Sequence, residues 1–207
     1  LADTPRRSAT VVSGTAATHP SHFGGYSIER DCEMRDDGSV LRFGEHVDIR
    51  GAYPEYRVRA RYGDFDLDIE IRNTDKVSWF IRSAVYDHLS LLSHYSGGIQ
   101  HRGERREISG LCTFEYAACA SPHSLRDRRL PARMKLPVDF FTYQVINLAS
   151  GTQLLLTQVM VGGRPILTAA YLRSAESYSR TLHDTRFEVL ELQDGAAESP
   201  DGRRMQL

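Results

Sequence analysis

The segment from Trp79 to His101 holds most of the side chains that could do acid–base chemistry. His88 directly follows Asp87, and an imidazole titrates near neutral pH, so His88 could act as a general acid or base. Because adjacent residues of a strand point to opposite faces, Asp87 is not expected to orient that imidazole. The sequence favours a structural interpretation, in which Asp87 ends a strand and hydrogen-bonds to the following loop.

Polar side chains also stand within strongly apolar stretches. Glu115 lies between two aromatic residues, and Tyr143 and Gln144 follow closely after Phe140-Phe141. A strand with aromatic residues on both faces leaves no polar face, so Glu115 must pair with an arginine, Arg173 being the most plausible, or line a wet cavity. The first option is a structural ion pair beneath a sheet. The second is a ligand cavity with an aromatic lining, and the sequence leaves both open.

The histidines do not form a metal-binding pattern. His88, His94 and His101 are six and seven residues apart, which matches no known zinc motif, and no thiolate lies near them. The sequence also contains no Gly-x-Ser-x-Gly elbow, no P-loop and no Gly-x-Gly-x-x-Gly. We therefore expect no metal site and no cofactor, and we disfavour serine hydrolysis and nucleotide chemistry.

Composition and charge exclude other classes of function. The 207 residues carry 26 Lys and Arg against 27 Asp and Glu, a formal net charge of −1, whereas a dedicated nucleic-acid binder usually has a large positive excess. Lysine occurs only at Lys76 and Lys135, so the other 24 cations are arginines. No apolar run approaches the roughly 18–20 residues that span a bilayer, so no transmembrane segment is expected.

The cysteines and the chain ends bear on compartment and completeness. Cys32, Cys112 and Cys119 cannot all pair and form no CxxC, which favours free thiols in a reducing, cytoplasmic compartment. No signal peptide is visible after Leu1. The chain starts without Met and stops at Leu207, directly after a Pro-Asp-Gly turn motif. Both ends look cut, and a missing partner domain or a homo-oligomer is compatible with the sequence.

The sequence predicts that the scaffold positioning these residues is a series of short strands. Residues 1–25 are rich in Thr, Ser, Ala, Pro and Gly, and we interpret them as a flexible arm without an element, followed by one domain over residues 26–207. Two runs, Glu55–Arg61 and Asp64–Ile71, alternate with period two and predict a hairpin with Tyr62-Gly63 as its turn.

In this hairpin, charged residues meet on one face and apolar residues on the other. The predicted pairs are Arg61–Asp64, Arg59–Asp66 and Arg57–Asp68 on the charged face, with Ala60–Phe65, Val58–Leu67 and Tyr56–Ile69 on the apolar face. Each cross-strand pair contributes about 0.2–1 kcal/mol, so the ladder mainly fixes the register.

Further strands follow along the chain. They are predicted at Val77–Tyr86, Glu107–Tyr116, Asp139–Leu148, Gln153–Val161, Arg164–Arg173 and Thr185–Leu192. Gly97-Gly98 and the arginine-containing stretch Ala120–Pro137 interrupt the pattern, and the latter is interpreted as an exposed loop. Gly14–Ala17 and Arg173–Tyr178 could each form one helical turn. Strands at such spacing with short turns predict an all-β, antiparallel sandwich or barrel.

Three stretches resemble an uncharacterised bacterial domain family, namely Tyr86–Leu92, Gly110–Ala117 and Leu136–Ile146. That family is similar to the two-barrel, lipocalin-like group that contains the carotenoid 1,2-hydratases, and the resemblance covers residues 40–205 or thereabouts. It implies an antiparallel, lipocalin-like (calycin-type) barrel with an apolar cavity, alone or as half of a tandem pair.

The resemblance also implies a chemistry. Acid-assisted hydration or isomerisation of a terpenoid-like alkene needs a proton donor and aromatic faces that stabilise a cation. The candidate catalytic residues are Asp87, His88 and Glu115. The candidate ligand-binding residues are Trp79, Tyr86, His94, Tyr95, Tyr116, Tyr143, Gln144, Tyr171 and Arg173.

Three functional hypotheses remain open at this point. The first is a protein that binds a hydrophobic small molecule, a lipid or a terpenoid, in an aromatic-lined cavity. The second is a hydratase or isomerase that acts on such a molecule by acid–base catalysis on the same scaffold. The third is a structural or interaction module whose buried polar groups only fix the strand register.

Overall fold

The residues that the structure describes lie mostly in antiparallel strands. The computed structural model describes residues 2–3, 8–13, 22–84, 86–119, 138–148, 151–187, 197–198 and 204–205. The elements are β1 (Ala2–Asp3), β2 (Ser8–Ser13), β3 (His22–Ser27), α1 (Ile28–Asp31), β4 (Cys32–Met34), β5 (Val40–Phe43), β6 (Val47–Ala52), β7 (Glu55–Tyr62), β8 (Phe65–Arg82), β9 (Tyr86–His101), β10 (Glu104–Cys119), β11 (Val138–Leu148), β12 (Thr152–Val161), β13 (Arg164–Ser174), β14 (Ser179–Leu182), β15 (Ala197–Glu198) and β16 (Arg204–Met205). The predicted all-β, antiparallel class is therefore confirmed.

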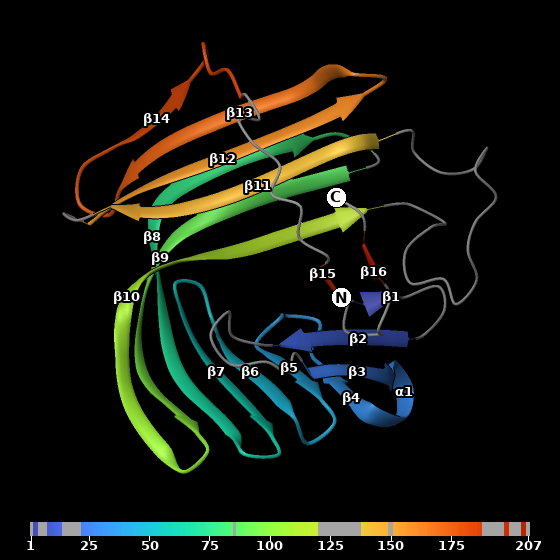
Figure 1. Cartoon of the computed structure of the whole chain (residues 1–207). Coiled ribbons are helices and arrows are strands. Elements are labelled where there is room, and N and C mark those ends of the chain that lie inside the picture. Colours follow the sequence, from blue (N-terminus) through green and yellow to red (C-terminus); the bar gives the residue numbers. More distant parts are fainter. Residues whose placement is uncertain are drawn as a thin grey trace.

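Strands that are neighbours in sequence are neighbours in the sheets. One sheet has seven strands in the order β10-β9-β8-β7-β6-β5-β4, and a second has four in the order β11-β12-β13-β14. Strands β1, β2 and β3 form a third sheet, and β15 pairs with β16. Figure 1 shows the four-stranded sheet lying over one part of the seven-stranded sheet, with β2 and β3 beside the other part.

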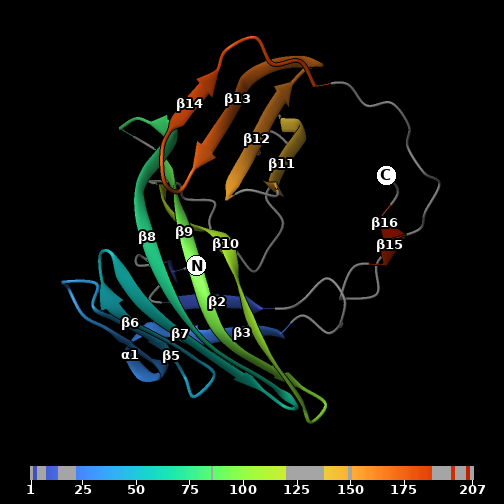
Figure 2. The same ribbon diagram turned by 90° about the vertical axis from the view of Figure 1, so that its left-hand side faces the viewer.

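Three long strands, β8, β9 and β10, run through both parts of the molecule. They contain 18, 16 and 16 residues, whereas a typical strand has about 5–6. Figures 1 and 2 show that they curve strongly. Their lower arm joins β4–β7, and their upper arm (residues 77–82, 86–92 and 113–119) lies against the four-stranded sheet. The β8–β9 register shifts between Asn73 and Val77 and again between Trp79 and Ile81, and such bulges bend strands.

A ring contact shows which side of the curve is the inner one. Tyr56 of β7 stacks on Phe114 of β10, with ring centroids 4.6 Å apart, although β8 and β9 separate these strands in the sheet. We call this inner side the concave face. The four-stranded sheet packs against the opposite, convex face of the upper arm, where Arg173 of β13 donates a hydrogen bond to Ser90 of β9. Odd-numbered residues of β9 therefore lie on the concave face and even-numbered ones on the convex face.

Apolar side chains gather in two separate clusters. The lower cluster joins the three-stranded sheet to β5, β6 and β7, and its buried members are Ala9, Phe43, Val47 and Ala60. The upper cluster joins β8 to β12 and β13, and its buried members are Phe80, Leu155, Ala169 and Tyr171. The upper cluster thereby fixes the four-stranded sheet over the convex face and positions the polar side chains described below.

The predicted hairpin is present, but its turn lies one residue further along the chain. Tyr62 pairs with Phe65, so the turn residues are Gly63 and Asp64, and Arg59 opposes Asp68 rather than Asp66. Gly63 takes a φ of +51°, which glycine adopts at little cost and which suits it to the first turn position. The partners shift by two residues, so every side chain keeps the face that was predicted for it.

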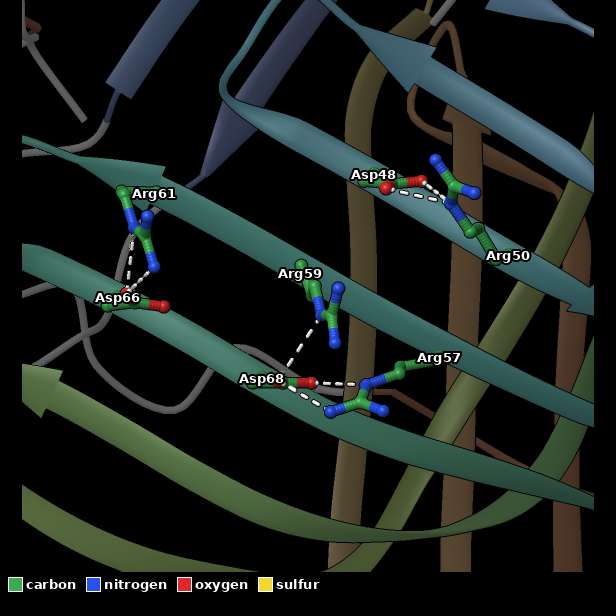
Figure 3. Close-up of polar contacts among 7 residues, drawn as sticks. All are labelled: Asp48, Arg50, Arg57, Arg59, Arg61, Asp66 and Asp68. Carbon is green, nitrogen blue, oxygen red and sulfur yellow. Dashed lines mark hydrogen bonds and ion pairs between the residues drawn. The ribbon is translucent and has the colours of Figure 1, made fainter.

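The charged face of this hairpin carries ion pairs, but of the three predicted pairs only Arg57–Asp68 is formed, because the two-residue shift moves Arg59 to Asp68 and Arg61 to Asp66. Figure 3 shows Arg57 and Arg59 converging on Asp68. Arg57 donates hydrogen bonds of 2.7 and 2.8 Å to the two carboxylate oxygens, and Arg59 Nε donates at 3.3 Å. The hydrogen bonds from Arg57, followed by the positive charges of both arginines, hold the pKa of Asp68 below its ordinary value against the opposing effect of desolvation. Next along the ladder, Arg61 Nε donates to Asp66 at 2.8 Å.

Two predictions about where a strand is interrupted are wrong. Val77–Tyr86 is not one strand, because β8 ends at Arg82 and the Ser83 N–H donates to the Tyr86 carbonyl across a turn into β9. Gly97-Gly98 does not interrupt a strand but lies within β9. Strand β8 approaches Gly97 so closely that a Cβ there would stand 2.2 Å from the carbonyl oxygen of Asp68, so glycine is what allows the strand to continue.

The prediction that residues 1–25 contain no element is wrong, because β1, β2 and part of β3 lie within that range. Strands β2 and β3 pair with each other, and Ala9 is buried in the lower cluster. The helical turn predicted at Arg173–Tyr178 is instead the end of β13 and a bend, whereas Ile28–Asp31 is a short helix. Thr185–Phe187 are not in a strand. The predicted domain limits stay a prediction.

Some expectations fall outside the described residues, namely the helical turn at Gly14–Ala17, the loop Ala120–Pro137, residues 188–192 and the side chain of Cys119. Cys32 and Cys112 are free thiols, as predicted. Burial raises the pKa of Cys112 to about 11. Within the described ranges, no helix is long and apolar enough to cross a membrane.

Candidate functional site

Two rows of polar side chains face each other where the four-stranded sheet meets the upper arm. On the convex face, Ser78, Ser90 and Glu115 occupy paired positions on β8, β9 and β10. Across from them, Asn147, Gln153 and Arg173 occupy paired positions on β11, β12 and β13. We call this polar interface the junction. It lies in an otherwise apolar interface, so each polar group needs a partner there.

Arg173 is the centre of the junction and is completely buried. Its Nη1 donates to the Ser90 carbonyl at 3.0 Å, to Ser90 Oγ at 3.2 Å and to Ser78 Oγ at 3.4 Å, while Nη2 donates to Gln153 Oε1. Burial lowers the pKa of Arg173 to about 10, partly offset by the charge of Glu115. The ion pair between Glu115 and Arg173, one of the two options that the sequence left open, is not formed, because Nη1 and Nη2 of Arg173 donate to neutral oxygens instead.

The partners of Glu115 are instead a tyrosine and a histidine. Tyr143 of β11 donates its hydroxyl hydrogen bond to Glu115 Oε1. His88 Nε2 lies 3.5 Å from Glu115 Oε2, and His88 Nδ1 lies 3.2 Å from the Tyr86 hydroxyl. The Glu115 and His88 side chains are 30% and 19% exposed. The structure thus links Tyr86, His88, Glu115 and Tyr143 into a chain of proton-carrying groups that is open to solvent at one side.

Aromatic rings surround this chain on the convex face. Phe80 lies 4.7 Å from the His88 ring and meets Tyr143 and Tyr171 edge-on at 5.7 and 5.6 Å between centroids. The Tyr171 hydroxyl donates to the Trp79 carbonyl, and burial raises the pKa of Tyr171. Aromatic rings therefore lie around Glu115, whereas the ligand cavity that they were expected to line stays a prediction. Four of the pockets on the described surface are lined by residues other than His88, Glu115 and Tyr143.

Asp87 does not take part in this arrangement. It is the cross-strand partner of Arg82, and its Oδ1 accepts a hydrogen bond of 3.0 Å from the Ser83 N–H. Alternation places it on the concave face, away from His88. The prediction that Asp87 ends a strand and bonds to the following loop is wrong, because Asp87 lies near the start of β9 and bonds to the turn before it. The hydrogen bond is a structural one, and this geometry gives no support to a catalytic role for Asp87.

The concave face of the upper arm carries a second feature, an exposed apolar surface. Two cross-strand rows form it, Val77–Leu91–Phe114 and Trp79–Leu89–Tyr116. Val77, Trp79 and Tyr116 are 40%, 39% and 57% exposed, and the other three side chains are half-buried. We call these six residues the concave apolar surface. Trp79 and Tyr116 were predicted to bind a ligand, and here they form neighbouring parts of one surface.

The remaining predicted residues lie elsewhere. His94 and Tyr95 line an open pocket of about 550 Å³ beside charged residues of β6, β7 and β8. Tyr95 also covers Gly110, where an added Cβ would meet the tyrosine ring at 3.3 Å. Gln144 donates to Thr142 Oγ1 at 3.3 Å and lies on the face of the four-stranded sheet opposite Tyr143. The predicted site is thus divided among the junction, the concave face and two outlying positions.

The sequence reasoning missed the neutral polar members of the junction. Ser78, Ser90 and Gln153 are fully buried, and Asn147 receives a hydrogen bond of 2.8 Å from Gln153 Nε2. Their one signal in the sequence is that each is a polar residue inside a strand of apolar neighbours. In the described part of the chain, no group of three or more His, Cys, Asp or Glu side chains could hold a metal ion.

Comparisons with known proteins agree with this fold. The chain belongs to the family of unknown function DUF6670, whose model matches residues 1–207. A crystal structure of a Nitrosomonas europaea protein provisionally assigned as AttH (NE1406) is similar, with a TM-score of 0.57 and 15% identity. The similarity covers 84% of this chain and 56% of that one, so the chain spans little more than half the length of that protein. A comparison with curated proteins gave no match.

Proposed function

We propose that this member of the DUF6670 family binds a hydrophobic small molecule, a lipid or a terpenoid, on the concave apolar surface. The observation that carries the proposal is the exposure of Val77, Trp79 and Tyr116 in two adjacent rows. Large apolar side chains on a strand face are normally covered, and contiguous exposed ones mark binding sites. Aromatic rings at the rim of a concave surface suit an apolar ligand of moderate size.

The sequence offers a direct reporter for this binding. Trp79 is the only tryptophan of the chain, so a change in intrinsic fluorescence reports on this surface. We expect 1-dodecanol and farnesol to shift the Trp79 emission to the blue in a saturable way. Tyr116→Ala should lower the affinity for both ligands about tenfold, because it removes roughly 1–2 kcal/mol of the binding free energy that comes from apolar burial.

The control for this experiment is Ile166→Ala. Ile166 of β13 is 63% exposed but belongs to the other sheet, so its removal should leave both affinities unchanged. If neither probe gives a saturable signal, or if Tyr116→Ala and Ile166→Ala behave alike, the concave apolar surface is not a ligand site.

The contacts of Glu115 favour a second candidate function, acid–base catalysis of the hydratase or isomerase kind at the junction. In a hydration, imidazolium His88 would give a proton to one alkene carbon. Glu115 would take a proton from the water whose hydroxyl joins the other carbon. The 3.5 Å contact between the two side chains would then return the proton to His88, so that both groups regain their starting states.

The two candidate functions use opposite faces of the same strands and can be tested separately. Incubation with farnesol in ¹⁸O-labelled water should give a labelled alcohol if the junction is catalytic. Glu115→Gln should abolish labelling while Trp79 still reports farnesol binding. Labelling that persists undiminished in Glu115→Gln and in His88→Ala would exclude these acid–base roles.

A further inference from the structure

An arginine stands at the upper end of the concave apolar surface. Alternation along the upper arm puts Arg82 on the same face as Trp79, one row beyond it, opposite Asp87 of β9. The guanidinium carbon of Arg82 lies 5.1 Å from the centroid of the Trp79 ring system. The apolar surface therefore ends in a positive charge that stacks on its largest ring.

The charge of Arg82 is not neutralised by a carboxylate of the described residues. No Asp or Glu oxygen in the described part of the chain lies within 4.0 Å of it, whereas Arg57, Arg59 and Arg61 on the opposite face are all paired. The nearest candidate partner by register is Asp87, but its Oδ1 instead accepts the Ser83 N–H. The exposed Arg82 thus keeps its in-plane N–H donors available.

We infer that the ligand of the concave apolar surface is amphipathic, with an alkyl chain on the two apolar rows and a carboxylate head group on Arg82. This inference rests on the function proposed above. A guanidinium that stacks on an indole keeps its planar edge free, and this edge matches the two oxygens of a carboxylate. The indole also restricts water on one side of the ion pair, which strengthens it relative to a fully solvated pair.

Asp87 sets a limit on the ligand charge. It lies across from Arg82 and repels an anion, so the site should favour a singly charged carboxylate over a phosphate monoester, which approaches two charges at neutral pH. A long-chain fatty acid is the chemical class that fits the apolar rows, the single guanidinium and the neighbouring acid. The carboxylate end would lie toward the turn between β8 and β9, and the chain would extend toward Val77 and Phe114.

The test compares three ligands that share one alkyl chain, namely laurate, 1-dodecanol and dodecyl phosphate, each titrated below its micelle concentration. Both Trp79 fluorescence and calorimetry are read, because a change at Arg82 can alter the emission itself. We expect laurate to bind about tenfold more tightly than 1-dodecanol, and high salt to remove most of that difference. Dodecyl phosphate should bind no better than laurate.

Arg82→Gln should reduce the affinity for laurate to that for 1-dodecanol and should leave the affinity for 1-dodecanol unchanged. Arg105→Gln is the matched control, because Arg105 of β10 is an exposed arginine paired with Glu107. This control substitution should change the affinity for neither laurate nor 1-dodecanol. Equal affinities for laurate and 1-dodecanol in the wild type, or tighter binding of dodecyl phosphate, would overturn the carboxylate assignment alone. Absence of binding by all three ligands would overturn the proposed function as well.

Discussion

At the scale of single residues, Arg173 is the largest fully buried side chain of the described structure. It is a fully buried cation whose hydrogen-bond acceptors are neutral oxygens, and its Nε has no hydrogen-bond partner among the described residues. Burying a charge in this way is costly unless the hydrogen bonds are kept. Since its pKa remains at about 10, the guanidinium stays protonated at neutral pH. The hydrogen bonds to Gln153 and Ser90 therefore contribute to the free energy of unfolding.

Replacing Arg173 should destabilise the fold. Arg173→Met removes the donors and leaves Gln153 Oε1 and the Ser90 carbonyl unsatisfied in a buried interface. We expect the free energy of unfolding to fall by about 3 kcal/mol. Urea denaturation followed by far-UV circular dichroism measures this value. Arg164→Met is the control on the same strand, at an exposed position, and should change stability by no more than about 0.5 kcal/mol. Equal stability of the two variants would show that the junction does not depend on Arg173.

The sequence predicted that Glu115 needs a partner, but not which one. That need follows from local information, because Phe114 and Tyr116 leave the carboxylate no polar face of its own. The partner depends on which residue of the four-stranded sheet lies above Glu115, and no local period encodes how two sheets are placed. In the structure, Tyr143 lies beside Glu115, and Arg173 contacts Ser78 and Ser90 instead. The need for a partner was therefore predicted correctly, whereas the arginine favoured as that partner was wrong.

At the scale of elements, the outer face of the lower arm is a ladder of alternating charge. Glu33, Arg42, Asp48, Arg59 and Asp68 occupy successive paired positions from β4 to β8. Each exposed pair adds little energy, but a slip by one residue would place every charge against the lower apolar cluster. The ladder thus fixes the register of five strands, and it accounts for several of the many arginines.

Asp68 gives this ladder a pH dependence with a definite sign. Its pKa in the folded state is held below the ordinary value of 3.8, mainly by hydrogen bonds from Arg57, so the unfolded chain binds the proton more readily. The stabilisation is complete above the ordinary pKa and is lost as the pH falls through the folded value. We expect Asp68→Asn to cost about 0.5–1 kcal/mol at neutral pH, because the pair is partly exposed.

Urea titrations of the wild type and Asp68→Asn at a series of pH values between about 7 and 3 test this sign. The difference between the two proteins should shrink toward zero at the acid end. Asp64→Asn is the control, because the nearest cationic nitrogens lie 3.9 and 4.0 Å from the Asp64 carboxylate. A difference that stays constant or grows toward low pH would contradict the role assigned to Asp68.

The close approach of β8 and β9 at Gly97 leads to a second prediction at the scale of elements. A Cβ at Gly97 would meet the Asp68 carbonyl oxygen at 2.2 Å and Ile69 Cα at 2.8 Å, and the φ of +148° disfavours any other residue. We expect Gly97→Ala to cost about 3 kcal/mol or more. Gly103→Ala has a positive φ but open space around it, so it should cost roughly 1–2 kcal/mol. Thermal denaturation compares them, and equal losses would show that the backbone contact is not limiting.

Period-two alternation was enough to predict the faces of the hairpin strands, since it depends only on which residues are apolar. Strand lengths and ends were harder to predict. Gly97-Gly98 has the composition of a turn, yet it lies within β9 because β8 needs the space that a side chain would fill. The turn at Ser83–Tyr86 has no glycine or proline and is held by side-chain and backbone hydrogen bonds instead. The close approach of β8 to Gly97 is a tertiary demand that leaves no local signal, whereas the contacts of this turn are local but use residue types that also occur in strands.

At the scale of the whole molecule, β8 runs beside β9 and β10 through both parts and contributes to both apolar clusters, with Phe65 and Leu67 packed against the lower one and Phe80 buried in the upper one. The lower cluster contains Phe43 and Val47, and the upper one contains Phe80 and Leu155. In Figure 1 the same three strands pass from one region to the other without a break. Loss of either cluster therefore exposes part of a sheet that the other cluster needs, which couples the two parts energetically.

This coupling predicts one cooperative unfolding transition. Val47→Ala lies in the lower cluster, whereas Trp79 lies on the upper arm. We expect Val47→Ala to cost about 1–3 kcal/mol. The Trp79 fluorescence transition in urea should move by the same amount as the far-UV circular dichroism transition, because a two-state protein gives coincident transitions with different probes.

Leu155→Ala is the converse variant. Leu155 is fully buried in the upper cluster, and its truncation should cost about 2–5 kcal/mol, again with coincident transitions for both probes. If Val47→Ala shifts the dichroism but leaves the Trp79 transition in place, the two halves unfold independently. The curved strands would then connect two separate units, and a ligand on the concave apolar surface would stabilise only the upper one.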